Sequence, residues 1–346
     1  MYIFNPEHDL CLANGDIHFV PPQSALDFGR DCASLTRFMH GLDAQADSDE
    51  PQLLKITPWG WNQVLKERLL KEGYAPELMP AEEQLAAIAK LSDRRVALKA
   101  LEYLNNRLSK NSSTTAEPDR GLFTPANYRI AAGSSAEVEE FIQSCSNVVL
   151  KAPLSGSGKG IRFVANTLSH SDAGWCRNLI KKHGCVVVEK RFRPVLEFAM
   201  LFKCTDSGSV AFVGYSLFYT ENGMYKGNIL ASDEWIENEI IKYIPHVKLA
   251  WAKEFLMEFL KENIVGRYEG YVGIDQFAHL PFEGDGEIGY NPVVEINLRM
   301  TMGLLAHNIY FMFGNEKLKD GTHYFEIVRE PQDGRMAYSY KIAPIK

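Results

Sequence analysis

The most restrictive feature of this sequence is the segment 123–190, which alternates between β-type and α-type patterns. Short runs rich in β-branched and aromatic residues favour strands, and apolar residues spaced by three and four favour amphipathic helices. We expect strands near 127–131, 147–152, 161–165 and 185–190, and helices near 135–144 and 171–182. Alternation of this kind predicts one α+β unit of roughly 80 residues.

The residues before this unit do not show the same alternation of strands and helices. In the first 91 residues we expect strands at 2–4 and 53–57 and a helix at 62–72, which Gly73 ends. Two helical stretches follow and meet at Ser92-Asp93, a pair typical of a helix start. The polar, low-complexity run at 109–121 predicts a flexible connection.

The section after the unit begins with two β-rich runs separated by a polar turn, which predicts a hairpin. The expected elements are strands at 196–204, 209–220, 271–277 and 293–299 and helices at 248–263 and 303–313. We therefore expect an α+β or α/β protein with four parts, at 1–91, 92–122, 123–194 and 195–346.

Composition excludes several classes of function. The 346 residues include 37 Lys and Arg against 44 Asp and Glu, a net charge of -7 with no long run of either sign. A nucleic-acid groove or a polybasic membrane patch is therefore not expected. The N-terminus does not resemble a secretion signal, and no long apolar stretch predicts a membrane span, so we expect a cytoplasmic protein. The six cysteines lack a C-x-x-C pair, which predicts reduced thiols.

The stretch VVLKAPLSGSGKGIRFV, residues 148–164, superficially resembles a nucleotide-binding P-loop. Pro153 and Gly160 stand where a Walker motif requires glycine and a hydroxyl residue, so that interpretation fails. A loop of small residues still exposes backbone N–H groups to phosphate oxygens, and Lys151 at its base can neutralise phosphate charge. The alternative is an exposed hairpin with a surface lysine, which suits Lys159 better than Lys151.

Two later strands carry polar residues on one face. In NPVVEINLRMTMG, period-2 alternation places Val294, Ile296, Leu298 and Met300 on one face, and Val293, Glu295, Asn297 and Arg299 on the other. Asp275 lies in GYVGIDQF, an otherwise apolar strand in which an unpaired carboxylate would be costly. Two carboxylates and an amide oxygen are hard ligands of the kind that Mg²⁺ prefers. The alternative is a solvated strand face with a chance ion pair.

In their order and spacing, these features resemble the ATP-grasp superfamily over about residues 92–305. The resemblance implies two α+β subdomains that clasp ATP, preceded by a smaller N-terminal α/β domain. It also implies that Lys151 binds the α- and β-phosphates and that the loop 155–160 closes over them. The loop residues concerned are Ser155, Gly156, Ser157 and Gly158.

The resemblance extends to the remaining site residues. Glu189, Lys190 and Phe192 match the hinge that binds adenine, and Glu197 matches the acid that holds the ribose. Asp275, Glu295 and Asn297 match the ligands of Mg²⁺, for which Mn²⁺ is a possible substitute, and Arg299 matches the arginine aimed at the transferred group. Arg94 stands where members have a lysine, which makes it a candidate phosphate contact.

The implied function is an ATP-dependent ligase that converts a substrate carboxylate into an acyl phosphate and condenses it with an amine. Its partners would be these small molecules, and a homodimer is possible. The same ATP site would also serve a small-molecule kinase, or an ATP-binding protein that has lost catalysis.

Substrate selection is expected in the first 91 residues, where polar side chains are dense. A His-Asp pair there would orient a substrate group or bind a second metal, or it would belong to a hydrogen-bonded turn. The residues concerned are Glu7, His8, Asp9, Asn14, Asp16 and His18. Trp59 and Trp61 would form a substrate wall or pack in the core. Lys226 and Asn228 would approach the γ-phosphate or lie in an exposed turn.

Overall fold

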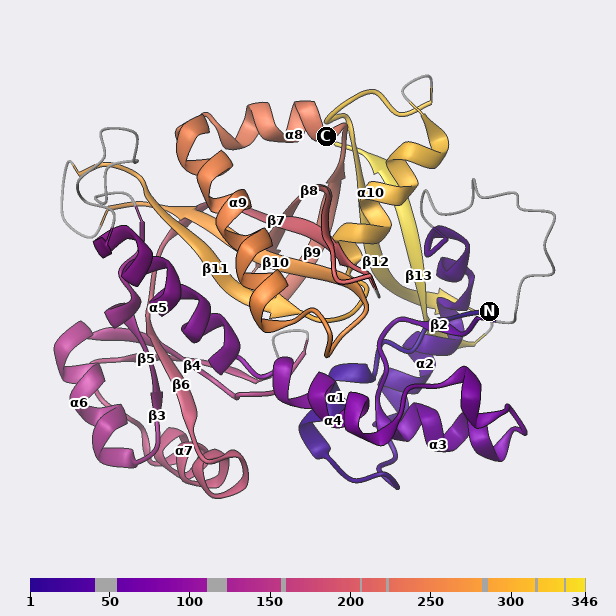
Figure 1. The fold of residues 1–346 in the computed structure, drawn as a ribbon, viewed down its shortest axis with the longest axis horizontal. Helices are drawn as coiled ribbons and strands as arrows, with labels where there is room; N and C mark the ends of the chain where they lie inside the picture. Colours follow the sequence, from indigo (N-terminus) through magenta and orange to yellow (C-terminus); the bar gives the residue numbers. More distant parts are fainter. Residues whose placement is uncertain are drawn as a thin grey trace.

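A computed structural model of the protein describes residues 1–40, 55–110, 123–156, 160–205, 207–221, 224–281, 286–314, 317–332 and 334–345. For 108–110 only the backbone is described. Two large sheets, each covered by helices, lie side by side, and the N-terminal segment, which holds a third sheet of two short strands, packs next to both (Figure 1). The predicted α+β architecture is confirmed.

The smaller sheet occupies the alternating segment identified in the sequence. Its four strands are antiparallel in the order β3-β6-β4-β5. They are β3 (Arg129–Ala132), β4 (Asn147–Lys151), β5 (Ile161–Ala165) and β6 (Val186–Lys190), with helices α6 (Ser135–Cys145) and α7 (His170–His183) and a 3-10 turn at Ala126–Tyr128. Ile130, Val148, Leu150 and Val188 pack with the helices on one face of this sheet. The expected elements are confirmed within one or two residues.

The larger sheet has seven strands in the order β11-β10-β7-β8-β9-β12-β13. They are β7 (Pro194–Cys204), β8 (Val210–Glu221), β9 (Met224–Leu230), β10 (Gly270–His279), β11 (Gly289–Asn297), β12 (His323–Gln332) and β13 (Arg335–Pro344). The helices of this part are α8 (Asp233–Ile240), α9 (His246–Asn263) and α10 (Met302–Phe313). The final hairpin, β12 with β13, was not predicted from the sequence.

Helix α5 (Arg95–Lys110) belongs to the core of the larger sheet. Ala97, Ala100, Leu101 and Leu104 are buried there among residues of α9 and β11. The predicted flexible run at 109–121 therefore begins inside a helix at 109 and 110, and its remaining residues lie outside the described part. Apolar spacing along one face explains why α5 packs instead of connecting two parts loosely.

The N-terminal segment consists of short elements. Its two strands pair in parallel, and the expected strand at 53–57 is displaced to Thr57–Pro58, with residues 53 and 54 outside the described part. The elements are β1 (Tyr2–Ile3), α1 (His8–Asn14), α2 (Gln23–Asp31), a 3-10 helix at Ala33–Phe38, β2 (Thr57–Pro58), α3 (Gln63–Lys71), a 3-10 turn at Pro76–Leu78 and α4 (Glu82–Leu91). Phe4, Leu35 and Trp59 share one core with Leu304 and Ile309 of α10. Trp59 thus packs in the core.

One expectation about β11 is wrong. Val293 is fully buried in the core, although alternation counted from Glu295 places it on the polar face. Register explains the difference, since Asp275 pairs with Glu295 whereas Phe277 pairs with Asn291. Between these two pairs β10 advances by two residues and β11 by four, so β11 contains a bulge. A bulge interrupts the regular alternation of side chains between the two faces of the strand.

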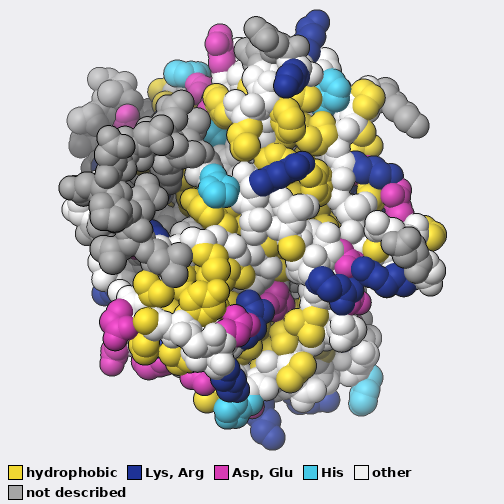
Figure 2. Space-filling view, turned by 90° about the vertical axis from the view of Figure 1, so that its right-hand side faces the viewer, with side chains coloured by type: hydrophobic (Ala, Val, Ile, Leu, Met, Phe, Trp, Pro, Cys, Tyr) yellow, Lys and Arg dark blue, Asp and Glu magenta, His cyan; other side chains and the backbone are white. Residues whose placement is uncertain are grey.

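The surface carries both signs of charge. On the face that Figure 2 shows, Lys and Arg side chains lie among Asp, Glu and hydrophobic side chains. Within the described part of the chain, no helix combines the length and hydropathy that crossing a bilayer requires.

Asn62 makes two side-chain hydrogen bonds, so its replacement by alanine should lower the stability of the protein markedly. Its Oδ1 accepts from the Leu65 amide at 2.9 Å and caps α3, and its Nδ2 donates to His8 Nδ1 at 3.1 Å. We expect Asn62→Ala to lower the free energy of unfolding by about 2 kcal/mol, half from the lost cap and half from the buried imidazole left without its donor. Urea unfolding measures this loss. Ser134→Ala, which removes a cap from α6 and an exposed hydrogen bond to Glu137 but leaves no buried partner unsatisfied, should cost about 1 kcal/mol. Equal losses in the two variants would contradict the second role of Asn62.

Candidate active site

Three charged side chains share the face of the smaller sheet that points away from its helices. Arg129 lies opposite Glu189 in the register of β3 with β6, and Lys151 lies on the same face of the adjacent β4. Arg129 Nε donates to Glu189 Oε2 at 2.8 Å, and Lys151 Nζ forms an ion pair with Glu189 Oε1. Glu189 is buried between these two cations. Burial, followed by the nearby Arg129 and Arg94, lowers the pKa of Lys151 well below its usual value.

The predicted metal ligands come together on the larger sheet. Asp275 of β10 and Glu295 of β11 are direct partners in the register. Asn297 Nδ2 donates to Asp275 Oδ2 at 3.1 Å, and no described cation lies within ion-pair distance of Asp275. Burial, followed by the like charge of Glu295, raises the pKa of Asp275 to about 7. Two carboxylates held this close favour a proton or a cation between them.

The two sheets are joined through buried arginines. Arg129 Nη1 reaches across to the Val293 carbonyl at 3.1 Å. Arg94, just before α5, pairs with Glu295 at 2.9 Å, while its Nη1 donates to the Ala152 carbonyl and to Ser155 Oγ, both at 2.6 Å. Arg94 therefore connects Glu295, a predicted metal ligand, to Ser155 of the small-residue loop.

Arg299, directly after β11, connects this group to the N-terminal segment. Its Nη2 donates to Asn297 Oδ1 at 3.0 Å, and its Nε donates to both carboxylate oxygens of Asp9, at 2.9 and 3.1 Å. Burial alone would raise the pKa of Asp9, but the charge and hydrogen bonds of Arg299 lower it. Asp9 also lies against the loop, because a Cβ added to Gly156 would stand 2.3 Å from its Oδ2.

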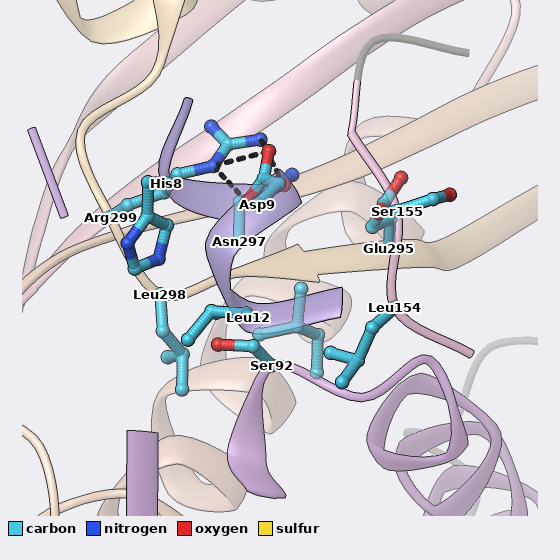
Figure 3. Close-up of a pocket in the computed structure, with 11 residues that line it drawn as sticks. His8, Asp9, Leu12, Ser92, Leu154, Ser155, Glu295, Asn297, Leu298 and Arg299 are labelled. Atoms are coloured by element: carbon cyan, nitrogen blue, oxygen red, sulfur yellow. Dashed lines mark hydrogen bonds and ion pairs between the residues drawn. The ribbon is translucent and has the colours of Figure 1, made fainter. Parts of the chain in front are cut away.

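A pocket opens beside Asp9 and Arg299 (Figure 3). It lies between α1, the residues before α5, the loop after β4 and the end of β11. Its polar lining includes His8, Asp9, Ser92, Ser155, Glu295, Asn297 and Arg299, and its apolar lining includes Leu12, Leu154 and Leu298. His8 is uncharged at neutral pH, since burial lowers its pKa to about 4.

The residues predicted to bind the nucleoside lie around Phe277. Glu197 pairs with Phe277 in the register of β7 with β10, and its carboxylate accepts from the Thr220 hydroxyl at 2.8 Å. Phe192 contacts the rings of Phe277 and His279, with centroids 5.5 and 4.4 Å away. Lys190 lies over the ring of Tyr128 at 4.7 Å. These contacts place aromatic and acidic groups at the connection between the two sheets.

Other predicted positions have different environments. Ser157, Gly158 and Lys159 lie outside the described residues. Lys226 pairs with Glu221 at 2.7 Å, and Asn228 is buried and donates to Ser216 Oγ at 2.6 Å. In the N-terminal cluster, the amide of Asp16 donates to Asn14 Oδ1 and that of His18 to Asp16 Oδ1, at 3.1 and 2.9 Å. Residues 14–18 therefore form the hydrogen-bonded turn that was the alternative interpretation.

Sequence reasoning missed the roles of Arg129 and Asp9. Arg129 begins an apolar strand, and a buried charge in such a run was the same signal that identified Asp275. Asp9 was noted as part of a polar cluster, but its partner Arg299 is 290 residues away, a separation that no local pattern bridges.

The contact between Gly156 and Asp9 predicts a loss of function without a loss of fold. A methyl group at Gly156 would collide with the Asp9 carboxylate, so the loop would move away from α1. If this loop covers a reactive site, Gly156→Ala should lower turnover of the substrate by roughly 10- to 100-fold. Gly133→Ala in the same subdomain is the control, since its added Cβ meets nothing closer than 3.8 Å. Equal turnover of both variants in a steady-state assay would count against a role for the loop.

The fold is similar to those of three solved enzymes. One is N5-carboxyaminoimidazole synthetase from Staphylococcus aureus complexed with ADP, with 16% identity, coverage of 94% of this chain and 75% of that chain, and a TM-score of 0.46. Another is a biotin carboxylase–β,γ-ATP complex from Campylobacter jejuni, with 12% identity, 80% and 58% coverage, and a TM-score of 0.47. The third is the biotin carboxylase domain dimer of a Hydrogenobacter thermophilus 2-oxoglutarate carboxylase with MgADP, ADP and bicarbonate, with 14% identity, 90% and 63% coverage, and a TM-score of 0.46.

This chain spans less than two thirds of the two carboxylase chains. The three enzymes are ATP-grasp proteins, members of the superfamily that the sequence resembles, and the likeness concerns the fold alone. No protein-family model matches the sequence, and neither does any curated protein.

Proposed function

We propose that this protein is an ATP- and magnesium-dependent ligase that activates a substrate carboxylate as an acyl phosphate and joins it to an amine. The observation that carries the proposal is the direct pairing of Asp275 with Glu295 across β10 and β11. These acids lie within the electrostatic influence of Lys151, a largely buried lysine of the other sheet. Phosphoryl transfer requires carboxylates that can hold a metal ion and a cation that can bind phosphates. The two neighbouring sheets supply these groups.

The residues fit a magnesium ion. Asp275 and Glu295 offer hard oxygen atoms at one place, and Asp275 has a raised pKa and no cation partner among the described residues. Asn297 lies beside them, and its amide would have to turn to add its oxygen, because Oδ1 accepts from Arg299 while Nδ2 donates to Asp275. No group of three or more His, Cys, Asp or Glu side chains that could hold a metal occurs in the described part, so two carboxylates and one amide form the candidate set. Mg²⁺ commonly takes its other ligands from water and phosphate, and Mn²⁺ accepts the same oxygen ligands. When bound, the ion would neutralise phosphate charge.

Other side chains would act on the nucleotide. Lys151 would bind the α- and β-phosphates while it shares Glu189 with Arg129. Phe192 and Lys190 would enclose the adenine, and Glu197 would bind the ribose. Because the Glu189 carboxylate is engaged by two cations, its contribution to adenine binding would come from the main chain.

The transferred group would lie at the other end of the site. Ser155 and Gly156, with Ser157 and Gly158 beyond the described part, would cover the phosphates and exclude water. Arg94 would hold that loop, to which it is already hydrogen bonded. Arg299 would stabilise the acyl phosphate, on which no side-chain nucleophile needs to act.

A screen for ADP release tests the proposal. Carboxylates crossed with amines are incubated with ATP and Mg²⁺, and we expect ADP and phosphate to form only when both substrates of the correct pair are present. A small-molecule kinase would instead release ADP without an amine and leave a stable phosphorylated product. Binding of ATP without turnover in any combination would identify a protein that has lost catalysis.

A further inference from the structure

We propose that Arg94 and a divalent cation compete for the Glu295 carboxylate, so that metal binding releases Arg94 from this acid. This inference rests on the proposed function and concerns the regulation of the same site. Its consequence is that the metal ion and a polyphosphate bind cooperatively.

The position of Arg94 is the first reason. Its side chain is only 5% exposed, and its Nη2 lies 2.9 Å from Glu295 Oε1. Glu295 is also the register partner of Asp275, with which it would hold the metal. A metal ion between these two acids would therefore share a carboxylate with Arg94 and place a second positive charge beside the guanidinium. Like charges this close oppose each other strongly in a buried site.

The balance of charge is the second reason. Four cations and four acids meet where the two large sheets adjoin. They are Arg94, Arg129, Lys151 and Arg299, and Asp9, Glu189, Asp275 and Glu295. A divalent cation that binds without an anion adds two positive charges to this balanced group. Uncompensated charge is costly in a buried site, so metal binding favours the departure of a cation or the arrival of an anion.

Arg94 is the cation that this addition would affect most. The ion-pair partner of Arg129 and Lys151 is Glu189, and that of Arg299 is Asp9. Neither of these acids is a proposed metal ligand, so these three cations would keep their partners. Of the four, only Arg94 pairs with an acid that the metal would take.

Release from Glu295 would leave Arg94 attached to the small-residue loop. Its Nη1 donates to the Ala152 carbonyl and to Ser155 Oγ, both at 2.6 Å, and neither bond involves Glu295. Ser155 and Glu295 both line the pocket of Figure 3. After release, Nη2 would keep only its longer bond to the Ser155 carbonyl, at 3.3 Å. Nε is buried and has no hydrogen-bond partner among the described residues.

The two donors Nη2 and Nε of Arg94 could then bind the oxygens of a phosphate group, a geometry that suits a guanidinium. The phosphate would also restore the balance of charge that the metal disturbs. A polyphosphate should therefore strengthen metal binding, and the metal should strengthen polyphosphate binding by the same factor.

Binding of Mn²⁺ to the full chain without nucleotide, measured by electron paramagnetic resonance, tests the competition. Arg94→Met removes the competing charge and should bind Mn²⁺ roughly tenfold more tightly than the wild type. Arg94→Lys keeps the charge and should stay close to the wild type. Arg95→Met is the matched control, because the neighbouring Arg95 pairs with Asp93 at 2.7 Å, and its affinity should change less than about twofold.

Two results would overturn the proposal. One is a Mn²⁺ affinity of Arg94→Met that equals or falls below that of the wild type, as expected if Arg94 only supports the structure. The other is an equal gain in Arg94→Lys, which would show that charge is not the cause. If Arg94→Met is not folded by circular dichroism, Arg94→Gln takes its place, since it is also neutral and keeps an amide donor for the Ala152 carbonyl.

A measurement on the wild type needs no neutral variant. In ¹⁵N spectra of the arginine side chains, the Arg94 signal is identified by its loss in Arg94→Lys. Addition of MgCl₂ should shift this signal, because the ion pair with Glu295 is broken. An Arg94 signal that stays unchanged at saturating Mg²⁺ would refute the proposal.

The location of the added affinity is tested in the Arg94→Met background. A second substitution, Asp275→Asn, should abolish the gain in Mn²⁺ affinity, because Asp275 is the other acid of the site. A gain that survives this substitution would show that Mn²⁺ binds elsewhere, and it would also refute the competition.

The same samples separate this inference from the proposed function. If Arg94→Met gains affinity but no pair of substrates releases ADP, the ligase reaction is refuted and the competition stands. If ADP is released and the neutral variants gain no affinity, only the competition is refuted. Absence of Mn²⁺ binding in the wild type and in every Arg94 variant would refute both.

Discussion

Replacing Asp275 by asparagine is expected to abolish magnesium-dependent ATP turnover and, above pH 7, to stabilise the fold. The loss of turnover should exceed about 100-fold, because the variant exchanges a charged ligand for a neutral one at the pair Asp275–Glu295. The fold should survive, since the oxygen of the introduced amide can still accept the hydrogen bond from Asn297 Nδ2. A steady-state ADP assay over a range of Mg²⁺ concentrations measures the first effect.

The gain in stability follows from the pKa of Asp275, which burial and then Glu295 raise from 3.8 to about 7. Between these values the folded protein binds a proton that the unfolded chain does not, so the wild-type free energy of unfolding falls as pH rises through this window. Asp275→Asn lacks this titration. It should match the wild type near pH 4 and exceed it by roughly 2 to 4 kcal/mol at pH 8.

Urea unfolding at pH 5 and pH 8, with and without Mg²⁺, measures the second effect. Magnesium should stabilise the wild type at pH 8 and have little effect on the variant. Glu221→Gln, which removes one exposed carboxylate of the same sheet, serves as the control and should change stability little at either pH. A variant less stable than the wild type at pH 8 would show that the charged form of Asp275 is not destabilising in the folded state.

Glu189→Gln is expected to lower the free energy of unfolding by roughly 3 to 5 kcal/mol. The substitution leaves Lys151 and Arg129 close together, largely buried and without their shared counterion. Removing one partner of a buried ion pair is far more destabilising than removing both. Glu140→Gln, an exposed position on α6, should change stability by less than about 0.5 kcal/mol.

The double variant Glu189→Gln/Lys151→Met tests the origin of that loss. Taking away one of the two uncompensated cations should recover about 1 to 3 kcal/mol relative to Glu189→Gln alone. If Lys151 contacts phosphate, a saturating ATP analogue should also stabilise Glu189→Gln, because its charge replaces the missing carboxylate. If the double variant loses as much stability as the two single variants together, the ion pair between Lys151 and Glu189 does not stabilise this face of the smaller sheet.

Local patterns predicted most of the fold. The strands and helices of 123–190 and the pair of β10 and β11 follow from β-branched runs and helical spacing, which short segments express by themselves. The bulge opposite Asp275 was not predictable, because it depends on how β10 and β11 align. The hairpin β12–β13 escaped notice, although both its strands have ordinary β-type composition.

The sequence by itself determined which residues are available for chemistry. Glu295, Asn297 and Arg299 stand out because an acid, an amide and a cation at a spacing of two fall on one face of a predicted strand, and Asp275 stands out because it is a carboxylate in an apolar strand. Only the tertiary structure decided which of them meet and what opposes them. Lys151 and Arg129 converge on Glu189 because β6 lies between β3 and β4, and Arg299 meets Asp9 because α1 packs beside the end of β11. Strand order and the packing of distant segments follow from how the whole chain buries its apolar surface, and no short segment contains that information.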